Sequence, residues 1–223
     1  MRKTPLVNGQ YYHIFSRSIA KYRVFNSDED YQRIVDIVRL YQFLEFKDRF
    51  SEFDVLSQKR KDFIYNDLKE SGKQMVEIVA YCIMPTHLHF ILKQVEDSGI
   101  SKFVSRSLNS FSKYFNNKHK RKGPLWEARF NSVLVEKDEQ LLHLTRYIHL
   151  NPCSAGLVEN PKEWKFSSYS EYVRKSEVDS GICKYHELIP ISPKEYKVFV
   201  TDHISFQREL SRIKHLLIDN YSG

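Results

Sequence analysis

The chain has 223 residues, of which 41% are apolar and 14% aromatic, so it can bury the core of a globular protein and is not a disordered polymer. Its 35 Lys and Arg exceed its 28 Asp and Glu, and the net charge of +7 suits a polyanionic partner without requiring one. The three scattered cysteines follow no metal-site spacing, so we expect reduced thiols. Because no apolar run approaches the ~20 residues that span a bilayer, we also expect a cytoplasmic location.

The first third of the chain predicts a strand, a helix and a charged insertion. Residues 10–17 (QYYHIFSR) are aromatic and β-branched, which is typical of a strand. Residues 26–28 (NSD) provide a helix start, and apolar residues then recur at helical spacing up to Tyr41. From about 45 to 75 the chain is charged with single apolar residues, which predicts a helical insertion with at least one exposed face.

Two apolar strands joined at Pro85 follow, and the second begins with a pair of histidines. Successive side chains of a strand point to opposite faces, so His87 and His89 should share one face while Leu88 points to the other. Two imidazoles side by side on a strand can chelate one divalent ion. A His-x-His pair more often satisfies buried hydrogen bonds, and this pattern alone leaves both interpretations open.

Residues 98–101 (SGIS) open a long helix whose faces differ in character. Its apolar stripe should face the core, whereas the opposite face carries Lys102, Arg106 and Lys113. That face can contact a phosphate backbone or simply be solvated. The basic cluster that follows at residues 118–122 (KHKRK) favours nucleic acid, and residues 130–135 then read as another strand.

The next predicted helix starts at Asp138 as its cap and ends at Asn151, because Pro152 follows. Tyr147 and Asn151 are four residues apart and are therefore neighbours on one helix face. A hydroxyl nucleophile and an amide oxygen are presented together, near helix-terminal carbonyls that attract a cation. Ordinary packing is the alternative interpretation of such a pair.

Six stretches taken together carry a family resemblance: residues 12–17 (YHIFSR), 84–90 (MPTHLHF), 123–130 (GPLWEARF), 146–152 (RYIHLNP), 155–158 (AGLV) and 164–169 (WKFSSY). They resemble the single-tyrosine HUH transposases, and more closely the REP-associated tyrosine transposase branch. The resemblance spans about residues 9–172. It implies an α+β fold, a ferredoxin-like antiparallel sheet with helices packed on one face. Residues 1–172 would form the catalytic domain, with the insertion and a mostly helical C-terminal extension over 173–223 as departures from the family pattern.

The resemblance also implies roles for four residues. In the family, paired histidines bind a metal, a helix tyrosine attacks a phosphodiester of single-stranded DNA, and a polar residue one turn later is the third ligand. Carried over by position, these roles fall on His87 and His89, on Tyr147, and on Asn151, with Mg²⁺ or Mn²⁺ as the metal. The implied activity nicks and joins single-stranded DNA through a phosphotyrosine intermediate, as in transposition of REP-type hairpin elements. A metal with only three protein ligands would leave positions for the phosphate.

Several alternatives accompany this assignment. Tyr114 is a second candidate nucleophile, but it has no polar ligand one turn away, so Tyr147 is preferred. His149 should point away from the face of Tyr147, His143 reads as a surface or packing residue, and His13 could contact DNA or the sheet edge. A replication or mobilisation nickase, or a non-catalytic nucleic-acid-binding module, are the competing functions.

The expected partner is single-stranded DNA that contains a hairpin. Binding to it would place the protein at the nucleoid. No membrane partner is expected, and a homodimer is possible. The sequence offers these basic residues as DNA contacts: Arg17, Lys102, Arg106, Lys113, Lys120, Arg121, Lys122 and Arg129.

Overall fold

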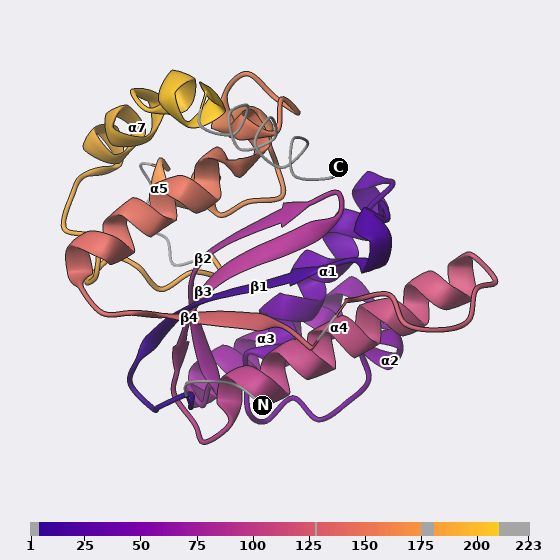
Figure 1. The fold of residues 1–223 in the computed structure, drawn as a ribbon. Helices are drawn as coiled ribbons and strands as arrows, with labels where there is room; N and C mark the ends of the chain where they lie inside the picture. The colour runs from indigo at the N-terminus through magenta and orange to yellow at the C-terminus, as the bar shows by residue number, and fades with distance from the viewer. Residues whose placement is uncertain (1–4, 128, 175–180, 210–223) are drawn as a thin grey trace.

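The fold is built on one four-stranded antiparallel sheet, seen in a computed structural model that describes residues 5–127, 129–174 and 181–209 (Figure 1). The strands lie in the order β2-β3-β1-β4. Their bounds are Tyr11–Arg17 for β1, Val76–Met84 for β2, His87–Gln94 for β3 and Asn131–Val135 for β4. With a helix between β1 and β2 and another between β3 and β4, this is the ferredoxin-like arrangement. The predicted α+β class is confirmed.

Helices α1 (Asp28–Tyr41) and α4 (Gly99–Lys118) cover one face of the sheet. A capping box formed by Ser27 and Asp30 starts α1. The apolar stripe predicted for α4 is buried against the strands. The main core therefore lies between these two helices and the strand residues that point toward them, among them Tyr12, Ile14, Leu88, Phe90 and Leu92.

Helices also cover part of the opposite face of the sheet, whereas the sequence predicted helices on one face only. Helix α5 (Asp138–Ser154) lies over this face, and α7 (Pro193–Thr201) packs against α5. A second core forms where apolar residues of α5 and α7 meet Val79, Cys82 and Ile91 of the central strands. The rest of this face, toward β1 and β4, carries the polar side chains described below.

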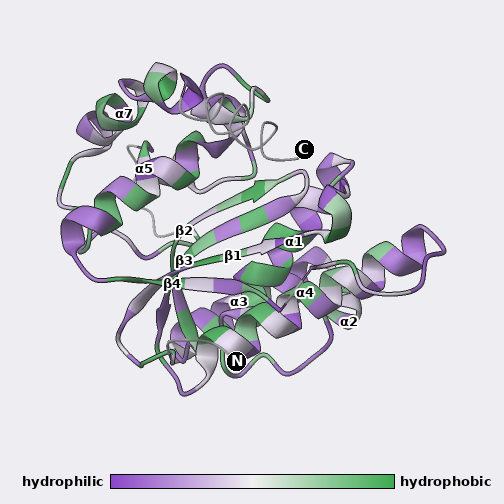
Figure 2. Cartoon of the chain, viewed as in Figure 1, coloured by the Kyte–Doolittle hydropathy of each residue, from purple (hydrophilic) through white to green (hydrophobic). Residues whose placement is uncertain are grey.

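The predicted helical insertion is present as α2 (Phe50–Asp54) and α3 (Gln58–Ser71), and most of its residues are exposed. Short elements complete the described chain: η1 (Ile19–Lys21), η2 (Pro161–Glu163) and α6 (Tyr169–Tyr172). Figure 2 shows that the far end of α4 and the turn after it are hydrophilic, so this end projects from the core into solvent.

Two boundaries differ from the sequence expectation. Helix α5 does not stop at Asn151 but continues through Pro152 to Ser154, because a proline in the last turn removes only one N–H and Ala155 still donates to the Asn151 carbonyl at 3.0 Å. Its N-cap is Lys137, and Asp138 lies in the first turn, where a carboxylate still favours the helix dipole.

The expected loop at 176–181 and terminal helix at 206–217 fall mostly outside the described residues. Residues 182–204 pack on the domain rather than apart from it, since Ile182 and Cys183 join the main core and Tyr196 and Val200 the second. Among the described residues, none of the helices has both the length and the apolar character needed to cross a lipid bilayer.

Candidate active site

The histidine pair lies at the start of the central strand β3. Pairing with β1 and β2 fixes the strand so that His87 and His89 project to the face away from α1 and α4, with ring centroids 5.0 Å apart. Leu88 between them is fully buried in the main core. The two imidazoles therefore share one face, as the strand periodicity predicts.

A third histidine, His13 of β1, completes the cluster. Its Nε2 lies 3.0 Å from Nδ1 of His89, and the two rings stack with centroids 5.2 Å apart. His87 in turn has its Nδ1 2.9 Å from the hydroxyl of Thr86. Among the described residues, neither Nε2 of His87 nor Nε2 of His89 has a hydrogen-bond partner. The ring nitrogens left available are thus the ones that a cation could use.

Burial keeps these rings neutral at physiological pH. Desolvation lowers the pKa of His13 and of His87 to about 4 each, and it lowers the pKa of His89 well below its ordinary value. The charge of Arg17 lowers the pKa of His87 and of His89 further. A neutral imidazole has the free lone pair that a metal ligand needs.

Tyr147 of α5 lies over the histidines. Its ring centroid is 6.1 Å from that of His89 and 6.2 Å from that of His13, with both rings edge-on to it. The residue is 39% exposed, so part of it is open to solvent. Partial burial raises the pKa of Tyr147, whereas the charge of Arg17 lowers it. The phenol therefore needs help to lose its proton.

Arg17 is the last residue of β1, and it pairs with His87 across the two strands. Its side chain is exposed, and its charge acts on His87, His89 and Tyr147 together. A guanidinium in this position can bind an anion such as a phosphate beside the tyrosine hydroxyl.

Asn151 lies one helical turn beyond Tyr147 and is half-buried. Its amide nitrogen is buried, without a hydrogen-bond partner in the described part of the chain. Burying an amide group with no partner is costly, so this position favours a ligand that the amide can bind. Rotation of the amide by half a turn would present its oxygen to the same place.

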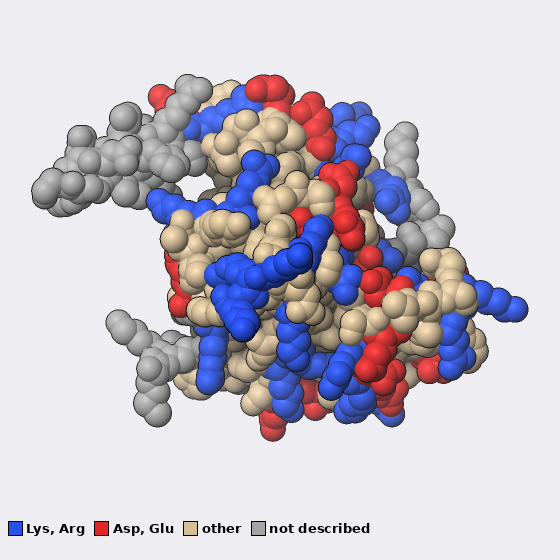
Figure 3. Space-filling view, turned by 90° about the vertical axis from the view of Figure 1, so that its right-hand side faces the viewer, with Lys and Arg blue, Asp and Glu red and all other residues tan. Residues whose placement is uncertain are grey.

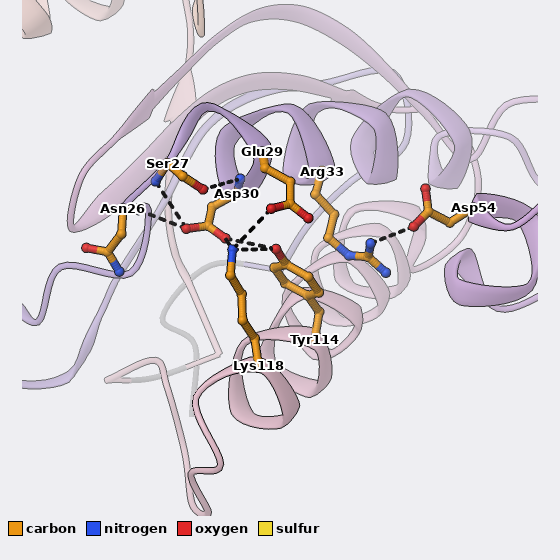
Figure 4. Close-up of polar contacts among 8 residues, drawn as sticks. All are labelled: Asn26, Ser27, Glu29, Asp30, Arg33, Asp54, Tyr114 and Lys118. Atoms are coloured by element: carbon orange, nitrogen blue, oxygen red, sulfur yellow. Dashed lines mark hydrogen bonds and ion pairs between the residues drawn. The ribbon is translucent and has the colours of Figure 1, made fainter.

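Tyr114 is held in a different environment, on α4, among polar contacts that link this helix to α1 (Figure 4). Its hydroxyl donates to Oδ1 of Asp30 at 3.0 Å and accepts from Nζ of Lys118 at 2.9 Å. The guanidinium of Arg33 lies 4.2 Å from the centre of its ring. These contacts join α1 to α4, which favours a structural role for Tyr114 and supports the choice of Tyr147.

Two further histidines of α5 lie away from the cluster. His149 is fully buried between the Tyr196 hydroxyl, 2.7 Å from its Nδ1, and the Ser168 hydroxyl, 2.8 Å from its Nε2. His143 is exposed and bonds to Arg146 at 2.8 Å. Neither has a ring contact with Tyr147 among the described residues.

The basic residues expected to contact DNA divide into two groups. Arg106 and Arg121 donate to main-chain carbonyls of Phe46 and Pro124, each within 2.8 Å, and Lys102 donates to the carbonyl of Asp97 at 3.2 Å, so these three brace the local structure. Figure 3 shows Lys and Arg gathered on the side of the molecule where α4 ends. The other five, Arg17, Lys113, Lys120, Lys122 and Arg129, have exposed side chains.

No set of three or more His, Cys, Asp and Glu side chains in the described ranges is arranged to hold a metal ion. The candidate donor set combines instead two imidazoles, His87 and His89, with the amide of Asn151. His13 was not identified as part of the site from the sequence. Its partner is 76 residues away, and only the pairing of β1 with β3 brings the two rings together.

Comparison with known proteins gives a consistent picture. Residues 51–151, which include His87, His89, Tyr147 and Asn151, match the family described as IS200-like transposases. The chain is 29% identical over 138 residues to a Haemophilus influenzae protein assigned as a REP-associated tyrosine transposase, covering 54% of this chain and 78% of that protein. It is 29% identical over 108 residues to the REP-associated tyrosine transposase of Escherichia coli, covering 48% of this chain and 63% of that protein.

The fold has a relative among solved structures. A REP-associated tyrosine transposase bound to a REP hairpin matches with a TM-score of 0.50 and 15% sequence identity, covering 82% of this chain and 96% of that chain. At this level of identity the match supports the fold.

Proposed function

We propose that this chain, whose residues 51–151 match the IS200-like transposase family, nicks and rejoins single-stranded DNA through a covalent bond between Tyr147 and a DNA phosphate. The observation that carries the proposal is the position of the Tyr147 ring, 6.1 Å from that of His89 and partly open to solvent. A nucleophile and a pair of candidate metal ligands thus meet at one place on a sheet whose topology is that of the family.

The reaction is a transesterification at phosphorus. Oη of Tyr147 would form a bond to the phosphorus as the bond to one bridging sugar oxygen breaks, and that oxygen would leave as a hydroxyl after taking up a proton. The phenol must lose its own proton; burial raises the pKa of Tyr147, and the nearby charge of Arg17 offsets part of that rise. The phosphotyrosine conserves the energy of the broken bond, so a second DNA hydroxyl can reverse the step and join strands.

The residues present fit a divalent cation, which we propose to be Mg²⁺ or Mn²⁺. His87 and His89 are neutral with available Nε2 atoms, and Asn151 has a buried amide nitrogen without a partner in the described chain, a position that its Oδ1 would take if the amide were rotated by half a turn. When bound, the cation would neutralise charge on the non-bridging phosphate oxygens. The protein's part is to hold the two imidazoles in fixed tautomers and to position Tyr147 beside them.

The proposed substrate is single-stranded DNA that contains a hairpin, since a relative with this fold was solved bound to a REP hairpin. Arg17 would bind the phosphate at the site, and the exposed basic residues Lys113, Lys120, Lys122 and Arg129 would bind the backbone beyond it. The histidines and Tyr147 come from one chain, so the reaction does not require a second copy. We assign catalysis to residues 1–172 and treat 173–223 as an extension.

A covalent-adduct assay tests this function. A labelled single-stranded oligonucleotide containing a hairpin is incubated with the protein and Mn²⁺, and the mixture is separated under denaturing conditions. The wild type should give a DNA-linked protein band and Tyr147→Phe should give none. Absence of the band with wild-type protein, or its persistence in Tyr147→Phe, would contradict the proposal.

A further inference from the structure

A groove of about 1500 Å³ lies between α4 and the segment that leads into β4. One wall is a stripe of small polar side chains on α4, from Ser101 through Ser105 and Asn109 to Ser112. At 1.5 Å per residue this stripe is roughly 16 Å long. The other wall is formed by residues 123–126 and 129–132. None of the candidate catalytic residues lines this groove.

Aromatic surface lies within the groove. Trp126 lines it, and the indole N–H is held by the hydroxyl of Ser112 at 3.0 Å and by the carbonyl of Leu108 at 3.4 Å. The buried rings of Phe25 and Phe111 support the indole from the core side, each with its centroid 6.3 Å away. The ring is therefore fixed in orientation. Phe130 adds a second aromatic side chain to the lining.

The described residues that line the groove carry positive charge and no negative charge. Its described lining includes the exposed Arg129 but no Asp or Glu. Serine hydroxyls and asparagine amides supply hydrogen-bond donors and acceptors without charge. Stacking surfaces, neutral polar groups and a cation are the features that bind single strands of nucleic acid, whose bases are exposed and whose backbone is anionic.

One end of the groove lies at β4, the edge strand of the sheet that carries the candidate active site. Asn131 and Ser132, the first residues of the edge strand β4, line the groove at that end. Asn131 pairs with Phe15 of β1, whose ring is 6.0 Å from that of His89 and 5.3 Å from that of His13. His89, which pairs with Phe15 on its other side, is two strand spacings from Asn131, or about 10 Å.

We infer that this groove binds an extended single-stranded segment of the DNA substrate, with bases against Trp126 and Phe130, and directs it around β4 to Tyr147. The inference rests on the proposed function and assigns the binding path of the substrate. The occupant is a single strand, because a duplex would keep its bases stacked within the helix and away from these rings. The path accounts for the polar stripe on α4.

Tryptophan fluorescence tests the inference directly, because the chain has only two tryptophans, Trp126 and Trp164. In Trp164→Phe the remaining fluorescence comes from Trp126, and titration with single-stranded oligo-dT of about 12 nucleotides should quench it saturably. The same sequence annealed as a blunt duplex should not. DNA binding that is detected by anisotropy but leaves Trp126 fluorescence unchanged would overturn the inference. Circular dichroism establishes that Trp164→Phe is folded. The wild type is titrated in parallel, and the fluorescence change that it shows should be absent in Trp126→Phe.

Charge substitution gives a second, independent readout. The double variant Ser105→Glu and Asn109→Asp places two carboxylates in the groove and should weaken oligo-dT binding by about tenfold or more. The matched variant Ser170→Glu changes an exposed serine outside the groove and should bind within about twofold of wild type. Equal affinities of the groove and control variants would contradict the inference.

The two proposals fail in different ways. If the groove inference alone is wrong, the Tyr147 adduct still forms while Trp126 fluorescence ignores bound DNA. If the proposed catalysis is wrong, no adduct forms with any oligonucleotide, yet single-stranded DNA still quenches Trp126.

Discussion

Nε2 of His13 lies 3.0 Å from Nδ1 of His89, so a residue of β1 fixes the orientation of a candidate metal ligand on β3. If Nε2 of His89 holds a cation, its Nδ1 carries the proton and donates to His13. Such outer partners typically contribute 10- to 100-fold in metal affinity. We predict that His13→Phe weakens Mn²⁺ binding by about tenfold or more, measured by electron paramagnetic resonance of free Mn²⁺. His143→Phe, an exposed histidine on α5, is the control. Unchanged Mn²⁺ affinity in His13→Phe would show that the contact only packs the sheet.

Replacing either histidine of the β3 pair should separate cleavage from binding. His87→Ala and His89→Ala should each reduce adduct formation by more than the ~100-fold that loss of an outer partner can cost, because each removes a proposed ligand itself. Oligonucleotide affinity, measured by anisotropy in the absence of metal, should stay within about threefold of wild type, since neither ring is charged at neutral pH. Parallel loss of binding and cleavage would mean that these histidines maintain the fold instead.

Tyr114→Phe should affect stability and leave catalysis intact. The change removes a hydroxyl that bonds to Asp30 and Lys118, at 3.0 and 2.9 Å, but it preserves the ring beneath Arg33. Loss of these bonds should lower the free energy of unfolding by about 1 kcal/mol, measured by urea denaturation. The adduct yield at a temperature where the variant is folded should match wild type. A variant of full stability that forms no adduct would identify Tyr114 as the nucleophile.

The buried His149 predicts a specific dependence of stability on acid. Burial lowers the pKa of His149 to about 3 in the folded state, whereas an unfolded histidine titrates near ~6.5. The unfolded state therefore binds the proton first, so the contribution of a neutral His149 is fully present above about pH 6.5 and is lost as the pH falls toward 3. Between pH 6.5 and 4.5 this one group should account for roughly 2–3 kcal/mol of lost stability.

His149→Gln should flatten that dependence, even though its stability at neutral pH is lower. The quantity compared is the slope of the free energy of unfolding against pH, measured by urea denaturation from pH 7.5 to 4.5. His186→Gln, which alters an exposed histidine, should keep the wild-type slope. An unchanged slope in His149→Gln would mean that the ring is protonated within the fold.

The sequence predicted the elements whose signals are local. The strand of residues 10–17, the hairpin around Pro85 and the amphipathic α4 each contain their own periodicity, and the structure confirms them. The helical insertion was also predicted correctly, because its composition changes abruptly from that of its neighbours. Recognition of the transposase family came from several motifs in order, which the comparisons confirm.

What the sequence could not predict depends on contacts between distant residues. His13 becomes part of the site only through strand register, and His149 is buried only because Tyr196 and Ser168 close around it. Packing of α5 on the second face of the sheet also supplies enough tertiary contact for the helix to continue through Pro152, against a local preference.

The identity of the residue that becomes linked to DNA can be measured directly. The adduct formed with Mn²⁺ and a hairpin-containing single strand is digested with a protease and a nuclease, and the modified peptide is sequenced by mass spectrometry. We predict a nucleotide phosphate on Tyr147, in the peptide that contains Ile148 and Asn151. A nucleotide on Tyr114 or on any other residue, in a protein that retains the wild-type sequence, would contradict this prediction.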